Sequence, residues 1–389
     1  MSLISAYSPL PVSFERGEGI WLWDGKNKEP YLDALTGIAV CGLGHAHPEI
    51  TKAICDQASK LIHTSNVYQI ELQTELAAKL TALSGMEQAF FSNSGAEANE
   101  AAIKLARAYG HQREINHPHI VVLEGAFHGR TLATLTATAN RKGQAGYEPL
   151  VSGFIRAPFN DSESIKNMAH HNNEIVAVML EPIQGEGGIH LPPSDYLKKI
   201  RELCDQNNWL MILDEVQTGN GRTGSYFNYQ QHGILPDIVT TAKGLGNGYP
   251  IGVCLMRGKA CNLFQPGNHG STFGGSPLAS RVGLTVIDII EKNNLCKNAA
   301  DMGQRLIKNL KEALSNNTHV QDIRGQGLMI GIELDKPCRD LMKIGLDQKI
   351  LFNVTADKVI RLLPPLNITG EQVDQIVERL KKCIELFYQ

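Results

Sequence analysis

The sequence lacks the features that mark several large protein classes. No stretch approaches the ~18 consecutive apolar residues that a membrane-spanning helix needs. The first residues, MSLISAYSPLPVSFERG, have neither the basic start and apolar run of a signal peptide nor the arginine-rich character of an organelle presequence. The net charge of −3 gives no general reason to bind nucleic acid or an anionic membrane. We therefore expect a cytoplasmic protein with small-molecule partners, without a nucleic-acid or membrane partner.

Motifs for metals and nucleotides are also missing. The eight cysteines are scattered and form no C-x-x-C pair, which argues for free thiols rather than a zinc or redox site. His45 and His47 form an H-x-H pair, but two ligands along a loop make a poor metal site, so we expect no metal. There is no GxxxxGK[ST], and GLGNGYP fails the G-x-G-x-x-G pattern because Tyr249 takes the last glycine position. A nicotinamide dehydrogenase is therefore disfavoured.

What the sequence does have, from about residue 50, is an alternation of helical patterns and short apolar runs. This pattern predicts a mostly parallel sheet with helices on both faces. The expected strands are 119–125, 174–182, 209–215 and 236–243, and the expected helices are 71–84, 97–113 and 194–207. After about residue 275 the pattern predicts helices over 277–292 and 298–316, a strand over 327–334, and a last helix capped by Thr369 with Gln372.

The length of 389 residues favours more than one domain. We predict an N-terminal segment over 1–48 that packs with the small domain, a large α/β domain over 49–275, and a small C-terminal α+β domain over 276–389.

Polar side chains follow the ends of the apolar runs, where ligands bind in α/β sheets. Asp214 ends one run and Lys243 another, while Phe127, His128 and Arg130 follow a third. Several such endings together indicate one lined pocket. Glu124 and Glu181 also end runs, but we interpret them as capping or supporting residues and leave them out of the site.

Pyridoxal phosphate is the cofactor whose needs these residues meet. It requires a desolvated lysine for a Schiff base, a carboxylate at its pyridine nitrogen, a flat side chain on its ring and amides for its phosphate. Lys243, Asp214, Phe127 and Gly95-Ala96 supply these in that order. Gly95 and Ala96 begin a helix, where free amides bind phosphate well, although serine and glycine at a helix start are also ordinary caps.

The chain resembles the class III aminotransferases of pyridoxal-phosphate fold type I over nearly its whole length. The resemblance rests on ordered motifs, including GIAVCGLGHAHP, SNSGAEANEAAIKLAR, FHGRT, EPIQGEGG, LDEVQTGNGRTG, TTAKGLGNGYPIG and HGSTFGGSP. It implies a large domain with a seven-stranded, mostly parallel sheet, and a homodimer with shared active sites.

The resemblance also implies a role for each site residue. Lys243 is catalytic, forming the Schiff base and then moving a proton. The residues that bind the cofactor are Gly95 and Ala96 through their amides, Phe127 and Val216 on the two ring faces, Asp214 at the pyridine nitrogen, Gln217 at the ring hydroxyl, and Thr272 at the phosphate of the partner subunit. The residues that bind substrate are Arg130, Glu186, Ser271 and Arg361, with Glu186 pairing with Arg361 and the flanking glycines leaving it room to move.

The activity implied is transfer of the terminal amine of an acylated ornithine to 2-oxoglutarate, which yields glutamate. Succinylornithine, succinyldiaminopimelate, 4-aminobutyrate and ornithine are alternative donors. A glutamate-semialdehyde aminomutase is more distant and is disfavoured by Arg361, and a non-catalytic binding protein would not need Lys243 and Asp214. Two positions depart from many relatives: Ala96 stands in place of a threonine, and Ile38 stands where ornithine aminotransferases carry a tyrosine, which disfavours ornithine as primary donor.

Overall fold

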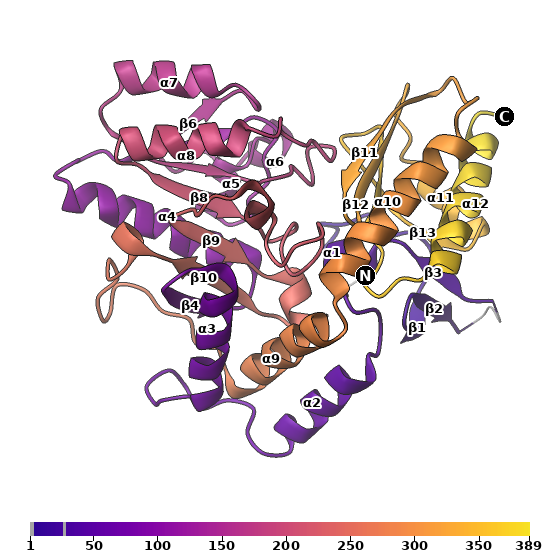
Figure 1. Cartoon of the computed structure of the whole chain (residues 1–389), viewed down its shortest axis with the longest axis horizontal. Helices are drawn as coiled ribbons and strands as arrows, with labels where there is room; N and C mark the ends of the chain where they lie inside the picture. The colour runs from indigo at the N-terminus through magenta and orange to yellow at the C-terminus, as the bar shows by residue number, and fades with distance from the viewer. Residues whose placement is uncertain (1–3, 26–28) are drawn as a thin grey trace.

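The structure is a computed structural model that describes residues 4–25 and 29–389. A seven-stranded sheet forms the centre of the larger of two lobes (Figure 1), with strand order β4-β10-β9-β8-β7-β5-β6. Strands β5 to β9 pair in parallel, whereas β10 is antiparallel to both β4 and β9. The predicted α/β fold with a mostly parallel sheet is therefore confirmed. The strands are β4 (Gln88–Ser92), β5 (His119–Leu123), β6 (Phe154–Ala157), β7 (Ile175–Leu180), β8 (Leu210–Asp214), β9 (Ile238–Thr241) and β10 (Gly252–Met256).

The apolar runs form central strands because both faces of this sheet are covered. In β8, Leu210 and Ile212 join the hydrophobic cluster that includes helix α4 (Gly95–Gln112). Met211 and Leu213 join the cluster on the other face, which includes helix α8 (Tyr196–Gln206). Burial on both sides explains why these strands read as continuous apolar runs rather than as alternating ones.

The smaller lobe contains two four-stranded sheets, ordered β1-β2-β3-β13 and β11-β12-β15-β14. The N-terminal segment enters this lobe because Leu32 of β3 pairs with Ile350 of β13. The capping box of α12 is present as predicted, with Thr369 and Gln372 exchanging hydrogen bonds. The elements are β1 (Phe14–Glu18), β2 (Trp21–Asp24), β3 (Tyr31–Asp33), β11 (Val320–Gln326), β12 (Met329–Leu334), β13 (Ile350–Leu351), β14 (Asn353–Thr355), β15 (Val359–Leu362), α10 (Leu295–Ala313), α11 (Leu341–Asp347) and α12 (Gly370–Phe387). The sequence pattern missed β1, β11, β13, β14, β15 and α11.

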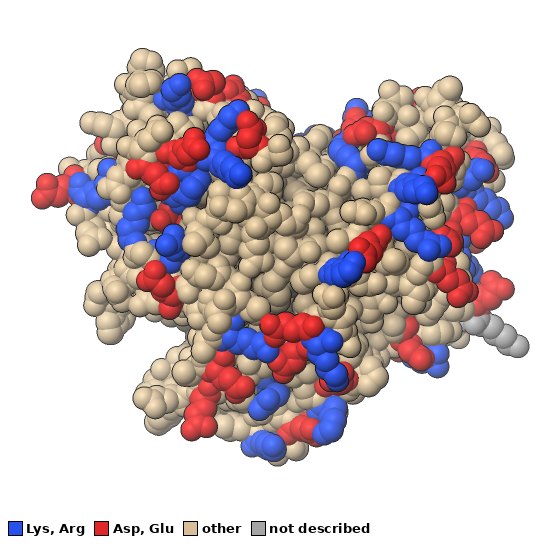
Figure 2. Space-filling model, in the orientation of Figure 1, with Lys and Arg blue, Asp and Glu red and all other residues tan. Residues whose placement is uncertain are grey.

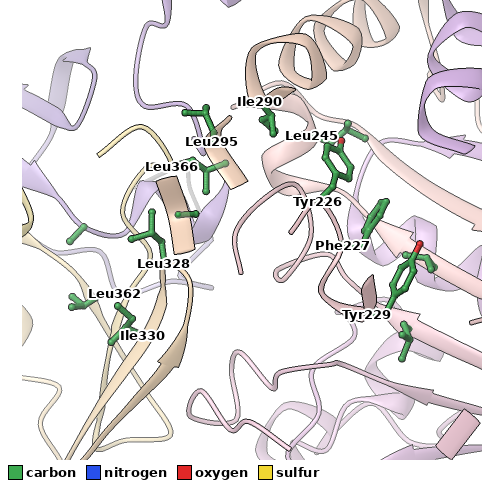
Figure 3. Packing of buried hydrophobic residues seen from close by; sticks show 14 of the residues in the cluster. Tyr226, Phe227, Tyr229, Leu245, Ile290, Leu295, Leu328, Ile330, Leu362 and Leu366 are labelled. Atoms are coloured by element: carbon green, nitrogen blue, oxygen red, sulfur yellow. The ribbon is translucent and has the colours of Figure 1, made fainter. Parts of the chain in front are cut away.

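The two lobes share one hydrophobic core. Figure 3 shows that its side chains come both from the aromatic group Tyr226, Phe227 and Tyr229 of the large lobe and from Leu328 and Leu362 of the small lobe. Helix α9 packs against α2 and α3, so residues on both sides of the predicted boundary at 275 contact each other, and the domain boundaries stay a prediction. The remaining helices are α1 (Thr36–Ala39), α2 (Pro48–Ala58), α3 (Glu71–Ser84), α5 (Leu132–Ala137), α6 (Arg141–Gln144), α7 (Ser162–His171) and α9 (Pro277–Lys292). Among the described residues, none of the helices is long and apolar enough to cross a membrane.

Candidate active site

A cavity of about 450 Å³ lies at the carboxyl ends of the central strands. Most of the predicted site residues line it, as expected for ligand sites in α/β sheets. These are Gly95, Ala96, Phe127, Arg130, Asp214, Val216, Gln217 and Lys243. Glu186, Ser271, Thr272 and Arg361 are not among its lining residues, and their positions are given below.

Asp214, at the end of β8, is held by two neighbouring side chains. Its Oδ2 atom lies 2.7 Å from Asn99 Nδ2 and 2.8 Å from His128 Nδ1, and the carboxylate is buried. Asn99 is fixed in turn, because its Oδ1 accepts from Thr240 Oγ1 at 2.7 Å. Oδ1 of Asp214 accepts only a longer bond from the Val216 amide, at 3.1 Å. The orientation of this carboxylate is therefore fixed, and it can still accept a further hydrogen bond from a group in the cavity.

Asn99 is a residue that the sequence analysis missed. It follows Gly95 by four positions in α4, so both lie on the same face of the helix. An amide side chain on the buried face of a helix that is otherwise rich in alanine is a detectable signal, because a buried polar group needs a partner.

Lys243 begins a short 3-10 turn (Lys243–Gly246) directly after β9. Its φ of 41° is unusual for a residue other than glycine, and backbone strain of this kind clusters at functional sites. Burial lowers the pKa of its ammonium group. The carboxylate of Glu186 opposes this shift, and the charge of Arg361 adds to it. The amine of Lys243 is thus more readily neutral, and more nucleophilic, than that of a solvated lysine.

The N-terminus of α4 forms part of the cavity wall. Ser94 caps the helix by accepting a hydrogen bond from the Glu97 amide at 3.2 Å. The amides of Gly95 and Ala96 lie in the first turn, where helix amides have no intrahelical partner and favour an anion. A Cβ atom on Gly95 would come within 2.6 Å of Val216 Cγ1, so only glycine fits opposite this valine.

Glu181, at the end of β7, connects two loops of the site. Its carboxylate accepts from the Phe127 amide at 2.9 Å and from the Gly185 amide at 3.0 Å. Burial, which exceeds the opposing effect of His128, raises the pKa of Glu181 to about 7. Glu181 was expected to lie outside the site, and His128 was placed near the pocket without a role, whereas both line the cavity. The carboxylate fixes the loop that carries Phe127, and Phe127 in turn lies under the guanidinium of Arg130 at 5.3 Å.

Arg361, on β15, lies behind the cavity wall and pairs with Glu186. Its Nη1 is 2.6 Å from Glu186 Oε1 and 3.2 Å from Gln217 Oε1, and its Nε is 3.1 Å from Asn353 Oδ1. The side chain of Arg361 is fully buried, while that of Glu186 is 33% exposed. The Nη2 atom of Arg361 is buried without a partner among the described residues. Through Gln217, this pair is connected to the cavity.

The glycines beside Glu186 are required for close packing. A Cβ atom on Gly185 would come within 2.5 Å of the Gln217 side chain. The space beside the Gly185 backbone is therefore already filled by Gln217, and the expectation that the flanking glycines leave Glu186 room to move stays a prediction.

Thr272 and Ser271 belong to a loop outside the cavity lining. Ser271 Oγ accepts from Asn93 Nδ2 at 3.1 Å, and Asn93 lines the cavity. Thr272 and its neighbour Phe273 are exposed. Arg130 is also exposed but reaches the cavity. The structure thus brings Ser271 to the edge of the site and leaves Thr272 exposed and outside the lining of this chain's own cavity.

Comparison with known proteins assigns the family. The profile of "Aminotransferase class-III" matches residues 4–384. The chain belongs to the class-III aminotransferases. The acetylornithine aminotransferase of Nitrosomonas europaea is 55% identical over 100% of this chain and 98% of its own length, and that of Methanothermobacter thermautotrophicus is 45% identical over 98% and 96%.

Solved structures of aminotransferases match this fold. The ornithine aminotransferase of Toxoplasma gondii superposes with a TM-score of 0.96 at 30% identity, covering 100% of this chain and 93% of its own. The N-acetylornithine aminotransferase of Stenotrophomonas maltophilia gives a TM-score of 0.86 at 35% identity, covering 99% and 98%. These matches confirm the predicted enzyme class and fold. Class-III aminotransferases depend on pyridoxal phosphate, which confirms the cofactor prediction.

The cavity fits this cofactor on its own chemistry. The acceptor capacity of Asp214 suits a protonated ring nitrogen, and the first turn of α4 suits a phosphate. Val216, packed closely against Gly95, supplies an apolar side chain to the cavity, and Phe127 supplies an aromatic one. The residues present are therefore compatible with pyridoxal phosphate.

Proposed function

We propose that the protein transfers the terminal amine of N2-acetylornithine to 2-oxoglutarate, which gives N-acetylglutamate 5-semialdehyde and glutamate, a reaction of arginine biosynthesis. The observation that carries this proposal is the buried Arg361 paired with Glu186, its one carboxylate partner in the described part of the chain, beside a cavity that contains Lys243 and Asp214. A transaminase with two different donors needs such an arrangement, because one donor brings a carboxylate to the reacting carbon and the other does not.

Lys243 and Asp214 carry the chemical roles. When bound, pyridoxal phosphate supplies an electron sink that weakens the C–H bond of the amine-bearing carbon. Lys243 Nζ, with its lowered pKa, would take the proton from that carbon and pass it on to the cofactor rather than back to the same carbon, which is what moves the amine. Asp214, held by Asn99 and His128, keeps a proton at the ring nitrogen. The amides of Gly95 and Ala96 bind the phosphate.

The substrates are positioned by arginines. Arg361 binds the α-carboxylate of glutamate or 2-oxoglutarate after Glu186 moves aside, and Arg130 binds the other carboxylate. With acetylornithine, Glu186 stays on Arg361. The Nη1 atom bonded to Glu186 then remains paired, and its charge is not left exposed in a closed apolar site.

Ile38 supports an acylated donor over free ornithine. It packs with Leu35 and Leu191 around a small apolar cluster, two residues before Val40, which lines the cavity. Free ornithine carries a charged α-ammonium group, and an apolar side chain gives that group no hydrogen-bond acceptor. The identities of 55% and 45% to acetylornithine aminotransferases support the same choice.

A donor panel tests this proposal. Single-turnover rates with acetylornithine, succinylornithine, succinyldiaminopimelate, 4-aminobutyrate and ornithine are compared at equal concentration, followed by regeneration with 2-oxoglutarate. We expect the acylated ornithines to react fastest and free ornithine much more slowly. Faster reaction of ornithine would overturn the donor assignment and match the high TM-score to an ornithine aminotransferase.

We also propose a homodimer with shared active sites. Four large apolar side chains lie exposed on two neighbouring loops, namely Ile62, Val67, Tyr68 and Phe273. The loops are joined by Asn66, whose Nδ2 donates to the Ser271 and Gly274 carbonyls at 3.0 Å each. Figure 2 shows charged side chains of both signs over both lobes and a band without charge between them. Exposed apolar clusters and charge-poor surface are typical of interfaces.

Subunit mixing tests the sharing. Thr272 is exposed, which suits a contact with the phosphate in the partner subunit. Lys243→Ala and Thr272→Glu are each expected to be inactive. If sites are shared, a mixed dimer contains one site with both changes and one intact site, so about a quarter of the activity returns on random mixing. If each chain forms its own site, mixing restores nothing.

The proposed location is the cytoplasm. All eight cysteines are described and free, and four of them, Cys204, Cys254, Cys338 and Cys383, are fully buried. Unpaired thiols are usual in a reducing compartment.

A further inference from the structure

The loop that carries Glu186 packs on one sheet of the small lobe. It lies over a row of residues that pair with one another across four neighbouring strands. Arg324 of β11 pairs with Gly331 of β12, Gly331 pairs with Arg361 of β15, and Arg361 pairs with Asn353 of β14. Directly opposite residues in antiparallel strands project to the same face. Arg324 and Arg361 therefore stand on one face of the sheet, with only Gly331 between them.

Because Gly331 has no side chain, the loop can pack directly against this face of the sheet. A Cβ atom on Gly331 would lie 2.9 Å from Ile189 Cβ, which is closer than side chains approach. Ile189 is fully buried in this position. The loop that follows β7 is thus seated in the gap between the two arginines.

Arg324 holds the far end of the loop by its backbone. Its Nη2 donates to the Gly188 carbonyl at 2.6 Å, and its Nε donates to the Ile189 carbonyl at 2.8 Å. The guanidinium is itself fixed, because Nη1 binds Glu333 Oε2 at 2.7 Å and Asp322 Oδ2 at 2.9 Å. Charge-assisted bonds of this kind are roughly twice as strong as neutral ones.

Thr355 holds the near end. Its hydroxyl donates to the backbone carbonyl of Glu186 itself, and its side chain is buried at the end of β14. The backbone of residues 186–189 is therefore anchored at both ends to the sheet that presents Arg361, while the Glu186 side chain remains one-third exposed.

We propose that Thr355 and Arg324 are positioning residues for donor selection. They fix the backbone of Glu186 relative to Arg361, so that Glu186 uncovers Arg361 by side-chain rotation alone. The inference rests on the proposed function, in which Glu186 covers Arg361 for the ω-amine donor. A loosened backbone would leave Glu186 poorly placed for Arg361, and acetylornithine would suffer more than glutamate, which brings its own carboxylate.

The test compares Thr355→Val with Thr355→Ser. Valine keeps the shape and removes the hydroxyl, whereas serine restores it. Hydrogen exchange of the amides of residues 185–190 is measured in the cofactor-free protein, and single-turnover rates with acetylornithine and glutamate are measured in the holoenzyme. Arg324→Met is the second variant, and Arg305→Met is its control, because Arg305 forms an exposed pair with Asp374 on the same lobe.

For Thr355→Val we expect faster loop exchange and a fall of about 2- to 10-fold in the rate ratio of acetylornithine to glutamate, as for loss of one hydrogen bond. Thr355→Ser should restore both values, Arg324→Met should show a larger change, and Arg305→Met none. Unchanged exchange overturns the anchoring, and an equal fall of both rates overturns the positioning role. Because exchange is measured without substrate, failure of the proposed donor assignment would leave that readout unaffected.

Discussion

The pair between Glu186 and Arg361 gives the sharpest quantitative prediction. Arg361 is fully buried, and Glu186 is its only carboxylate partner among the described residues. Glu186→Ala removes that partner and leaves Arg361 with two neutral acceptors, Gln217 and Asn353. In the open enzyme, water can enter the space left by the carboxylate. When acetylornithine closes the site, that water is displaced and the charge loses its compensation.

The magnitude follows from the burial of the two partners. Breaking a fully buried ion pair by removing one partner costs about 3–5 kcal/mol. Glu186 is 33% exposed, so solvent weakens the pair, and we reduce the cost to about 2–3 kcal/mol. At about 1.36 kcal/mol per tenfold change in rate, this is a roughly 30- to 150-fold fall in the rate with acetylornithine relative to that with glutamate.

The assay is single-turnover conversion of the cofactor, monitored by its absorbance, with each donor in separate experiments. Glu186→Gln should fall between wild type and Glu186→Ala, because it keeps an acceptor for Arg361 without the charge. Glu312→Ala, in an exposed pair on α10, should change neither rate. If both rates of Glu186→Ala fall by the same factor, Glu186 does not select between donors and its role is structural.

Three further predictions concern the cofactor cavity. The purified protein should be yellow, and borohydride reduction should attach the cofactor to the peptide that contains Lys243; peptide mapping that finds another lysine would refute this role. Gly95→Ala should weaken cofactor binding at least tenfold in a spectroscopic titration, because the new Cβ meets Val216 at 2.6 Å. Undiminished binding would show that Val216 can shift to make room for the added methyl group. The folded-state pKa of Glu181, about 7, lies above its ordinary value of 4.5. The folded state therefore holds the proton more tightly, and wild type should lose stability relative to Glu181→Gln as pH rises from 4.5 to 7, by up to about 1.4 kcal/mol per pH unit in urea unfolding of the cofactor-free protein. A pH-independent difference would contradict the raised pKa.

The large lobe was predictable from the sequence because its signals are local. Strand β8 appears in the sequence as an unbroken apolar run because both its faces are buried. Asp214 is recognisable as the polar residue that ends this run. The antiparallel strand β10 was not recognised, because nothing in its own residues reports the direction of its neighbours β4 and β9. Similarly, the pairing of β3 with β13 joins segments that lie more than 300 residues apart, and no local pattern encodes that register.

The residues that line the site were predictable from the sequence, but the side chains that hold them in place were not. The positions of Lys243, Asp214 and Phe127 follow from strand ends, whereas the side chain of Asn99 reaches Asp214 across 115 residues of sequence. Glu181 was recognised as a strand end but was taken for a supporting residue. Its contact with the cavity comes from the loop of Phe127 folding over it, which only the three-dimensional arrangement provides.

The close packing of Gly185 against Gln217 bears on how one site accepts two different donors. Glycines beside a gating residue suggest a flexible loop, but here the Gln217 side chain fills the space that a Cβ would need. A mobile loop would lose entropy each time Arg361 was covered again, at about 1–2 kcal/mol per residue fixed. An anchored backbone avoids most of this cost, because only the rotamers of one side chain change. The anchored backbone and the partial exposure of Glu186 are therefore complementary. The anchored backbone keeps Glu186 within reach of Arg361, and the partial exposure lets the Glu186 side chain rotate away.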